Sequence, residues 1–366
     1  MTRYLLVGGG TAGHVNPLLA VADRLREQES DDAILVLGTA EGLEARLVPE
    51  RGYELATIAR VPFPRRVGRA ALRFPREFRD VVRSIRALLL EREIDVVVGF
   101  GGFVSGPAYV AAWRQKVPIV VHEANAVPGF ANRLGSRLTR YVGVAFPGTR
   151  LPHARVVGMP LKHELEVLDP RVRHDEALEH FGLDAAKPVL LVTGGSLGAR
   201  SINETVFEAA ATILGAGWSI LHIAGERAAL PEPSLAGYRI LAYCDRMDLA
   251  FSAAELVIAR AGSATVSELT ALGVAAIYVP LAIGNGEQRL NAKGVVDAGG
   301  AVLVDNADFT PEWVSRELIS ILGDRAAIAE LAARAAKIGS RDGTARTVAL
   351  VREAVEAAAR TEGERS

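Results

Sequence analysis

His14 is the first residue in this chain whose type and position suggest chemistry. It ends the segment VGGGTAGH at 7–14, where a short apolar run gives way to glycines and then to helical spacing. Imidazole titrates near neutral pH, so a histidine at the mouth of such a loop is well placed to act as a general base. The simpler interpretation is a histidine that only caps the turn, but the surrounding loop favours a functional role.

The glycines around His14 recur later in the chain. VGGGTAGH matches VTGGSLGA at 192–199 under a shift of 185 residues, and Thr11 falls on Ser196. Each copy follows a predicted strand and opens a predicted helix. Small residues there let backbone N–H groups and a helix N-terminus approach an anion or a diphosphate. The repeat predicts two similar halves, each with a phosphate-binding loop.

Two other motif interpretations of these loops fail on their partner residues. The first loop satisfies G-x-G-x-x-G, but the next strand ends at 37–39 with no acid before Glu41 to hold a ribose, which disfavours a nicotinamide site. The second loop satisfies the hydrolase pattern G-x-S-x-G around Ser196. His222 is the only histidine after it and lies in an apolar run, so a catalytic triad is disfavoured.

Further polar segments follow other predicted strands. They are FGGFVSGP at 100–107, HEAN at 122–125, AGSATVSE at 261–268 and GNGEQRLN at 284–291. Glu268 stands three residues after Thr265, which is capping-box spacing, but its carboxylate also suits a ribose diol. Each segment alone is typical of a surface loop. Their shared place at the carboxyl ends of strands predicts a polar ligand-binding region.

The sequence carries no D-x-D motif and no His, Asp and Glu cluster with metal-ligand spacing. We therefore expect no metal in the reaction. If a nucleotide diphosphate leaves, helix dipoles and backbone amides have to stabilise its charge.

Apolar runs separated by helical spacing define the elements that position these segments. The predicted strands cover 4–8, 33–37, 95–98, 117–121, 141–145, 188–193, 218–223, 238–243, 256–260, 275–280 and 301–304. Asn16 is the predicted N-cap of the first helix, with Pro17 in its first position. Further helices are predicted at 199–213 and 343–361. β-branched runs alternating with helices indicate parallel sheets buried on both faces, joined by a linker at 158–187.

Composition limits the class of protein. The chain has 366 residues, 49% of them hydrophobic, with 42 Lys and Arg against 43 Asp and Glu. This length suits about two domains, and the near-neutral charge excludes a general nucleic-acid binder. The single cysteine, Cys244, fits a reducing cytosol. The N-terminal apolar run breaks at three glycines and no run approaches ~18 residues, so neither a signal peptide nor a membrane span is expected.

One segment departs from this neutral average. Residues 60–79 hold seven Arg and one Glu, interleaved with large apolar residues: Val61, Phe63, Val67, Leu72, Phe74 and Phe78. A basic and apolar segment predicts a surface for anionic lipid. A protein partner and a solvated amphipathic helix are the alternatives.

Taken in order, the polar segments resemble those of the MurG family. GGGTAGHVNP, FGGFVSGP, HEANAVPG, TGGSLGAR, RAGSATVSE and GNGEQRLNA follow that family's order over about 4–350. The resemblance implies an α/β protein of GT-B architecture, with two Rossmann-like domains whose parallel sheets face a central cleft. We expect an acceptor-binding, membrane-facing domain at 1–160 and a UDP-GlcNAc-binding domain at 161–342. A C-terminal helix and tail at 343–366 is expected to pack back on the first domain.

The resemblance also implies an activity. Members of the family are inverting glycosyltransferases that move N-acetylglucosamine from UDP-GlcNAc to the C4 hydroxyl of the muramoyl sugar of lipid I. Lipid I is undecaprenyl-pyrophosphoryl-MurNAc-pentapeptide, and the product is lipid II, the peptidoglycan precursor. Members are peripheral proteins of the cytoplasmic membrane face and need no metal cofactor. The expected partners therefore include anionic inner-leaflet lipid at 60–79 and cell-wall or division proteins, but no nucleic acid.

Family roles are carried over to matching positions. His14 matches the proposed catalytic residue. The expected donor contacts are Thr11, Ala12, Gly13, Asn125, Lys162, Ser196, Cys244, Ser263, Ala264, Thr265, Val266, Ser267, Glu268 and Gln288. The expected acceptor-diphosphate loops comprise Gly9, Gly10, Gly13, Gly101, Gly102 and Ser105. The resemblance implies that Glu268 binds the ribose and Ser196 the donor diphosphate. It also implies that Gln288 and Asn125 bind the sugar and that the backbone near Cys244 contacts the uracil.

Three positions depart from the family's pattern. Lys162 stands where the family usually has arginine, which keeps the charge but loses the bidentate fork. The usual glutamine pair is Glu287-Gln288, which leaves Gln288 as the sugar contact. Ala12 replaces a glycine of some members and keeps the loop compact.

The expected mechanism uses His14 to take the proton of the acceptor C4 hydroxyl while that oxygen displaces UDP with inversion. Two other classes of function remain open. One is another GT-B enzyme, such as a UDP-GlcNAc epimerase or a transferase onto a soluble acceptor, and the basic apolar segment argues against it. The other is a non-catalytic UDP-GlcNAc sensor or scaffold, and the intact His14 loop argues against that.

Overall fold

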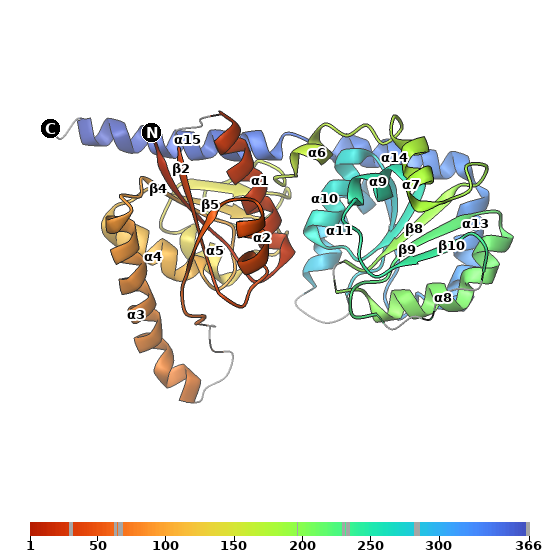
Figure 1. Cartoon of the computed structure of the whole chain (residues 1–366), viewed down its shortest axis with the longest axis horizontal. Coiled ribbons are helices and arrows are strands. Elements are labelled where there is room, and N and C mark those ends of the chain that lie inside the picture. Colours follow the sequence, from red (N-terminus) through yellow and green to blue (C-terminus); the bar gives the residue numbers. More distant parts are fainter. Residues whose placement is uncertain are drawn as a thin grey trace. The chain divides into compact units, whose positions relative to one another are not determined.

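The computed structural model describes residues 1–28, 32–61, 64, 69–195, 197–228, 231, 235–281 and 286–363 (Figure 1). They form two compact units. Unit 1 is Met1–His163 with Asp342–Ser366, and unit 2 is Glu164–Arg341. The ranges predicted from the sequence, 1–160 and 161–342, lie close to these limits.

The described part of unit 1 contains a seven-stranded parallel sheet in the order β3-β2-β1-β4-β5-β6-β7. Its strands are β1 (Arg3–Val7), β2 (Ala33–Gly38), β3 (Glu54–Thr57), β4 (Val96–Gly99), β5 (Ile119–Glu123), β6 (Tyr141–Val144) and β7 (Ala154–Val156). Its helices are α1 (Ala12–Gln28), α2 (Glu44–Glu50), α3 (Arg69–Glu91), α4 (Ser105–Gln115), α5 (Phe130–Gly135) and α15 (Gly343–Gly363). Since β1 and β4 are neighbours, the loops after them meet at the switch point of the sheet, where ligands bind in such folds.

Unit 2 repeats the architecture, with six described parallel strands in the order β10-β9-β8-β11-β12-β13. They are β8 (Val189–Thr193), β9 (Ser219–Ile223), β10 (Tyr238–Leu241), β11 (Leu256–Ala259), β12 (Ala275–Tyr278) and β13 (Ala301–Leu303). The helices are α6 (His163–Glu166), α7 (His174–Phe181), α8 (Arg200–Gly215), α9 (Met247–Ala253), α10 (Ser263–Leu272), α11 (Glu287–Asp297), α12 (Pro311–Trp313), α13 (Ile319–Gly323) and α14 (Arg325–Ile338). A π-helical turn at Val314–Leu318 joins α12 to α13. Here β8 and β11 flank the switch point.

Side-chain alternation along the strands builds a core on each face of the unit 1 sheet. Tyr4 and Leu6 of β1 belong to the cluster that includes α1 and α15, whereas Leu5 and Val7 belong to the cluster that includes α3 and α4. Successive residues of a strand point to opposite faces, so a strand covered on both sides has to be apolar throughout. The sequence therefore predicted these strands as continuous apolar runs.

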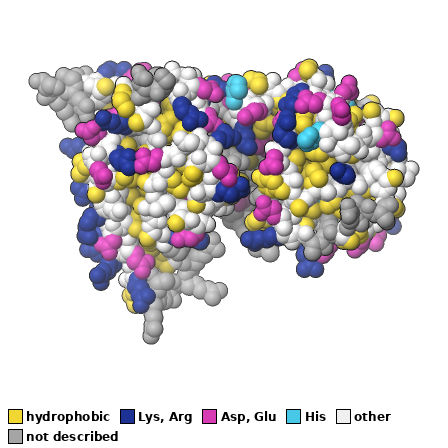
Figure 2. All heavy atoms as spheres, in the orientation of Figure 1, with side chains coloured by type: hydrophobic (Ala, Val, Ile, Leu, Met, Phe, Trp, Pro, Cys, Tyr) yellow, Lys and Arg dark blue, Asp and Glu magenta, His cyan; other side chains and the backbone are white. Residues whose placement is uncertain are grey.

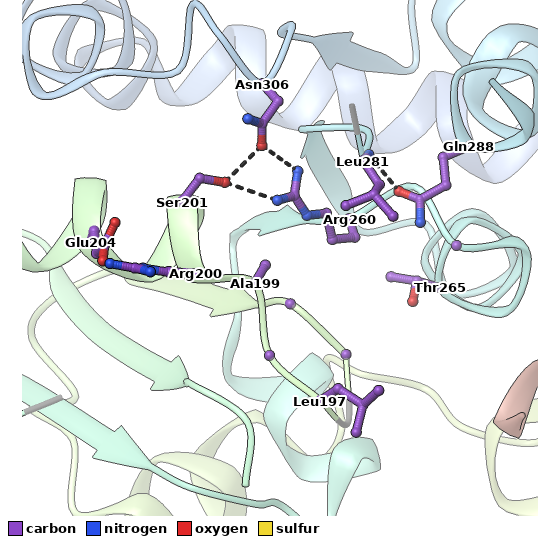
Figure 3. A pocket seen from close by; sticks show the side chains of 14 residues that line it. Leu197, Ala199, Arg200, Ser201, Glu204, Arg260, Thr265, Leu281, Gln288 and Asn306 are labelled. Carbon is purple, nitrogen blue, oxygen red and sulfur yellow. Dashed lines mark hydrogen bonds and ion pairs between the residues drawn. The ribbon is translucent and has the colours of Figure 1, made fainter. Parts of the chain in front are cut away.

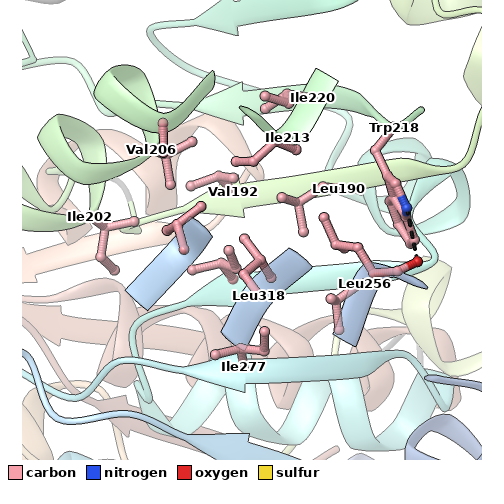
Figure 4. Packing of buried hydrophobic residues seen from close by; sticks show 14 of the residues in the cluster. Leu190, Val192, Ile202, Val206, Ile213, Trp218, Ile220, Leu256, Ile277 and Leu318 are labelled. Carbon is pink, nitrogen blue, oxygen red and sulfur yellow. Dashed lines mark hydrogen bonds between the residues drawn. The ribbon is translucent and has the colours of Figure 1, made fainter. Parts of the chain in front are cut away.

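Unit 2 has the same kind of core (Figure 4). Leu190 and Val192 of β8 pack with Ile202, Val206 and Ile213, which recur at helical spacing on α8. All five side chains are fully buried. At the edge of this cluster the Trp218 indole donates a hydrogen bond of 3.2 Å to the Leu322 carbonyl, so its polar atom is satisfied inside an apolar core.

Two sequence-based interpretations of local structure are wrong, and two strands were missed. α1 begins at Ala12 rather than after Asn16, because His14 N and Val15 N already donate to the Thr11 carbonyl at 3.1 Å. Pro17 consequently lies inside the helix. Thr265 lies within α10, whose N-cap is Gly262, so the capping-box interpretation of Glu268 fails. Strands β3 and β7 were not predicted, since they are short and mostly exposed.

Helix α15 belongs to unit 1 although its sequence follows unit 2. It contacts α1, β4, β5 and β6, and Val348, Leu350, Val351 and Ala354 are buried in the first core. Thr344 Oγ1 accepts from Leu161 N and donates to Leu161 O, both at 3.1 Å. The C-terminal helix is thus an integral element of unit 1.

Candidate active site

The first glycine loop lies after β1, beside the loop that follows β4. Phe100 N donates to the Val7 carbonyl at 2.8 Å. A Cβ added to Gly102 would lie 2.6 Å from the Gly9 carbonyl oxygen, so Gly102 is required for the close approach of the two loops. Gly101 faces the His14 ring, because a Cβ there would lie 3.1 Å from its Nε2. The two predicted loops therefore meet at His14.

The His14 ring is half-buried and held on one edge. Its Nδ1 lies 3.1 Å from the Gly9 carbonyl oxygen and 3.3 Å from Thr11 Oγ1. A carbonyl oxygen only accepts, so in neutral His14 the proton sits on Nδ1 and Nε2 carries a free lone pair. The ring thus has the tautomer that a general base acting through Nε2 requires.

A buried carboxylate under the first loop is the main feature that sequence reasoning missed. Glu44 is fully buried, and its Oε2 accepts from Gly10 N at 2.8 Å. Its Oε1 accepts from Thr39 N at 2.9 Å and from Thr39 Oγ1 at 2.8 Å. Burial raises the pKa of Glu44, but the hydrogen bonds from Gly10 and Thr39 outweigh it and hold the pKa below its usual value.

Glu44 changes what the first loop can bind. The Gly10 amide already donates to a carboxylate, so it is not available to an acceptor diphosphate in this structure. Ser105, also predicted in an acceptor loop, is fully buried and supports its own turn: Gly101 N donates to its Oγ at 3.1 Å, and the Oγ donates to Gly101 O at 2.7 Å. Thr11 and Gly10 are exposed at the loop surface, while Gly9 is buried.

A second buried carboxylate organises the segment that carries Asn125. Glu123 accepts from Asn125 N and Gly129 N, both at 2.9 Å, and from Asn132 Nδ2 at 3.0 Å. The Tyr109 hydroxyl then donates to Asn132 Oδ1 at 2.8 Å. The loop at 124–129 is folded around this carboxylate, which places the half-buried Asn125 just beyond the end of β5.

The second glycine loop lies near a positively charged side chain, Arg260, rather than a carboxylate. It borders a cavity of about 600 Å³ lined by Gly194, Gly195, Leu197, Gly198, Ala199, Arg200, Ser201, Glu204, Arg260, Gly262, Thr265, Leu281, Gln288 and Asn306 (Figure 3). Arg260 follows β11 directly. Its Nη1 donates to Asn306 Oδ1 at 2.7 Å and its Nη2 to Ser201 Oγ at 2.9 Å.

Neutral oxygens hold the Arg260 guanidinium. Besides Asn306 and Ser201, it donates to the carbonyls of Val279 at 2.9 Å and Pro280 at 3.1 Å. Burial lowers the pKa of Arg260. Glu204 also lines the cavity, but its carboxylate accepts from Arg200 Nε at 2.7 Å. A half-buried cation with neutral partners favours an anionic ligand in the cavity.

The structure distributes the predicted donor residues unevenly. Thr265 and Gln288 line the cavity, and Gln288 Oε1 accepts from Leu281 N at 2.9 Å. Ser263 is buried at the start of α10, and Glu268 is half-buried further along the same helix. Ala264, Val266 and Ser267 were also predicted as donor contacts, and they lie on the same helix, α10 of unit 2. Ser196 lies outside the described residues.

The remaining predicted contacts occupy other places. Cys244 is buried between β10 and α9, and burial raises the pKa of its thiol. Lys162 is exposed and belongs to unit 1, as do Thr11, Ala12, Gly13 and Asn125. Arg260, Ser201 and Asn306 line the cavity but were not among the site residues predicted from the sequence. Arg260 and Asn306 follow strands, so the rule that ligands bind at carboxyl ends could have found them.

The structure also disfavours the catalytic triad around Ser196. His222, needed for a triad, is fully buried between the Tyr238 hydroxyl at 2.8 Å and Asn203 Oδ1 at 3.1 Å. Within the described ranges no group of His, Cys, Asp and Glu has the geometry of a metal site, and no helix could span a membrane.

Comparison with known proteins places the chain in a family. Residues 4–144 match the glycosyltransferase family 28 N-terminal domain, and residues 189–347 match the glycosyltransferase family 28 C-terminal domain. A relative from Leifsonia xyli subsp. xyli is 61% identical over 98% of this chain and all of its own length. It is named a UDP-N-acetylglucosamine--N-acetylmuramyl-(pentapeptide) pyrophosphoryl-undecaprenol N-acetylglucosamine transferase. The chain belongs to the MurG family.

Solved structures agree with this membership. The crystal structure of Acinetobacter baumannii MurG is 32% identical, with a TM-score of 0.77, and the match covers 96% of this chain and all of that one. The UDP-GlcNAc 2-epimerase of Neisseria meningitidis, at 14% identity, has a TM-score of 0.68 over 96% of this chain and all of that one. The second likeness shows a shared GT-B fold alone. The predicted fold class and family are confirmed.

Proposed function

We infer that this chain is an inverting N-acetylglucosaminyltransferase of peptidoglycan synthesis, which transfers GlcNAc from UDP-GlcNAc to the C4 hydroxyl of MurNAc in lipid I and forms lipid II. The named relatives at 48–61% identity over nearly the whole chain carry this inference. In the structure it is supported by the cavity around Arg260, whose positive charge suits the diphosphate of a nucleotide sugar.

We propose that His14 is the general base. Its Nδ1 proton points to the Gly9 carbonyl, so Nε2 is free to take the proton of the acceptor C4 hydroxyl. The oxygen then attacks the anomeric carbon of GlcNAc, and the bond to the UDP diphosphate breaks with inversion. The acceptor proton ends on His14, and UDP leaves with the bonding pair.

The leaving group needs a positive environment, which we assign to the second loop and its neighbours. The guanidinium of Arg260 is preorganised by Ser201 and Asn306, so its charge needs little reorganisation when negative charge develops on the diphosphate. Backbone amides at the start of α8 add to this field. We propose that these groups stabilise the leaving diphosphate and that the reaction needs no metal ion.

One turnover assay tests the whole proposal. The purified chain is mixed with UDP-GlcNAc and a short-chain lipid I analogue in EDTA, and UDP release and disaccharide product are followed. Product that depends on the lipid acceptor is the expected result. UDP-GlcNAc binding without product, with an active family member as the control, would contradict it and point to another acceptor or a sensor. Product only after addition of Mg²⁺ would contradict the metal-free step alone.

We also propose that the chain binds the cytoplasmic face of the cell membrane through the 60–79 segment. Exposed Arg73, Arg76 and Arg79 lie along α3, where dark blue side chains gather in Figure 2. Leu72 beside them is 83% exposed. The sequence overstated the apolar part, because Val61 is buried and Phe74 and Phe78 pack on the core. Phe63 and Val67 lie outside the described residues.

Vesicle sedimentation tests this membrane proposal. We expect the chain to sediment with vesicles containing an anionic phospholipid and not with neutral phosphatidylcholine vesicles. Replacing Arg73, Arg76 and Arg79 together by Glu is expected to abolish sedimentation, since each basic residue near an anionic surface contributes about 1 kcal/mol. Equal sedimentation of this variant and the wild type would contradict the proposal.

A further inference from the structure

The peptide group between Gly9 and Gly10 has a hydrogen bond at each end. Its N–H, on Gly10, donates to Glu44 Oε2 at 2.8 Å. Its C=O, on Gly9, lies 3.1 Å from His14 Nδ1, which donates to it. Glu44 and His14 therefore do not touch, but a single planar amide joins them.

An amide placed in this way couples the two side chains. A carboxylate that accepts from the N–H of a peptide increases the negative charge on the C=O of that same peptide, because amide resonance links the two ends. A more negative carbonyl is a stronger acceptor for the Nδ1 proton of His14. A carboxylate hydrogen-bonded directly to a histidine fixes the ring tautomer in the same sense.

The surroundings of Glu44 are built to hold a charged group in that position. The side chain is fully buried, and Thr39 donates to its second oxygen from both backbone and hydroxyl. A Cβ added at Gly9, Gly38 or Gly42 would collide with the carboxyl group, so three glycines leave room for it. These donors favour the ionised form, and the pKa of Glu44 lies below its usual value despite burial.

We propose that Glu44 is a positioning residue for His14, which acts through the Gly9–Gly10 peptide group to keep the proton on Nδ1 and the lone pair on Nε2. The proposal rests on the role of His14 as general base. It explains why a loop predicted to bind a diphosphate gives its Gly10 amide to a carboxylate. The acidic residue lies far from His14 in the sequence and reaches it only through the fold.

The Glu44→Gln variant tests this coupling. The amide has the shape of the carboxyl group, but whichever way it is turned its NH₂ faces a backbone N–H, either that of Gly10 or that of Thr39. One hydrogen bond and the negative charge are lost. We expect kcat to fall about 10- to 100-fold, by analogy with residues that orient metal-binding histidines, and the Kd for UDP-GlcNAc to stay within about twofold.

A spectroscopic measurement separates positioning from a general loss of structure. The protein is labelled with ¹⁵N-histidine, and the His14 signals are identified by their absence in His14→Gln. When the ring is neutral, we expect wild-type His14 to show a protonated Nδ1 and an unprotonated Nε2. In Glu44→Gln we expect both nitrogens to shift toward an average of the two tautomers.

Glu255→Gln is the matched control. Glu255 is also a largely buried carboxyl that accepts from a backbone amide, Val189 N at 2.6 Å, but it lies at the amino end of β11 in unit 2. We expect this variant to keep the wild-type tautomer and turnover. If Glu44→Gln does not fold, Glu44→Asp replaces it, since the shorter side chain keeps the charge but withdraws from Gly10.

The outcomes are distinct. A wild-type tautomer in a folded Glu44 variant would overturn the proposal, whether or not kcat falls, because a lower kcat alone would then reflect loop structure. A shifted tautomer with reduced kcat supports it. A shifted tautomer with wild-type turnover would support the coupling and overturn the assignment of His14 as the base, so the failures of the two proposals can be told apart.

Discussion

The two glycine loops have nearly the same sequence pattern and opposite electrostatic surroundings. Gly10 and Gly195 correspond under the 185-residue shift and share a left-handed backbone, with φ of 89° and 83°. The first loop lies over the carboxylate of Glu44, whereas the second lies beside the guanidinium of Arg260. His14 on the first loop corresponds to Ala199 on the second.

This contrast shows that a glycine pattern specifies a backbone shape and leaves the charge to residues elsewhere. The second loop keeps the anion-binding character that such a shape allows. In the first loop the Gly10 amide is hydrogen-bonded to Glu44, and the loop carries His14 instead. On the proposed function, two copies of one supersecondary unit serve two roles, one accepting a proton and the other binding a diphosphate.

The largest effect is expected from removing the base. His14→Ala should lower kcat by about 10²- to 10⁴-fold, the usual contribution of general base catalysis, and leave the Kd for UDP-GlcNAc within about twofold. Turnover and calorimetric binding measure the two quantities. Wild-type turnover would exclude His14 as the base, and a matching loss of donor affinity would assign the first loop to binding.

Removing the cation beside the second loop, Arg260, should weaken binding rather than turnover. Arg260→Met is expected to weaken UDP affinity about 10- to 100-fold, since hydrogen bonds to charged groups contribute about 1.5–3 kcal/mol. Calorimetry with UDP measures this. Arg325→Met, which removes an exposed arginine beside Glu255, is the control and should bind UDP as the wild type does. Unchanged affinity in Arg260→Met would remove the distinction between the loops.

The loops should also differ in their tolerance of a side chain. A Cβ at Gly198 would collide with the Ala224 carbonyl, and its φ is 76°, so Gly198→Ala should cost about 2–4 kcal/mol of unfolding free energy. The corresponding Gly13 lies in α1 with no atom closer to an added Cβ than Thr11 Oγ1 at 3.8 Å, so Gly13→Ala should change this free energy by less than about 1 kcal/mol. Urea denaturation compares them. Equal losses would show that packing does not distinguish the loops.

The smallest expected effect is a loss of unfolding free energy in acid, which both units should show. Burial lowers the pKa of His122 in unit 1 and of His222 in unit 2, each to about 4. The unfolded chain binds a proton on each near pH 6.5, so stability is full above that pH and is lost as pH falls toward 4. Each unit should lose about 2 kcal/mol between pH 7 and pH 5 from this cause.

Urea denaturation at the two pH values measures this loss. His222→Gln removes one titrating group and should make the unit 2 transition less sensitive to pH while leaving that of unit 1 unchanged. An unchanged pH dependence of unit 2 in this variant would exclude His222 as the source.

The sequence predicted the parts of the molecule that depend on local periodicity. Buried strands such as β1 and β8 are apolar throughout because both faces are covered, so they could be found without a structure. The edge strands β3 and β7 lack that signal. The start of α1 was placed at Asn16 because a Pro at 17 normally begins a helix, whereas here the first turn forms before it.

The site was predictable where its residues follow strands and not where they approach from elsewhere. His14, Thr265 and Gln288 were named from their loops, and Arg260 could have been found by the same rule. Glu44 could not. Its carboxylate reaches Gly10 only because α2 follows β2 and brings it under the neighbouring loop, a contact across 34 residues that no spacing encodes.

The placement of α15 has a consequence for the order in which the chain is made. Val348, Leu350, Val351 and Ala354 complete the core of unit 1, yet the whole of unit 2 is synthesised before them. While the ribosome is still translating residues 164–341, α15 does not yet cover strands β4, β5 and β6 on the sheet face that also carries α1. Unit 2 is continuous in sequence and can reach its final fold first, whereas unit 1 becomes complete only when the last helix leaves the exit tunnel.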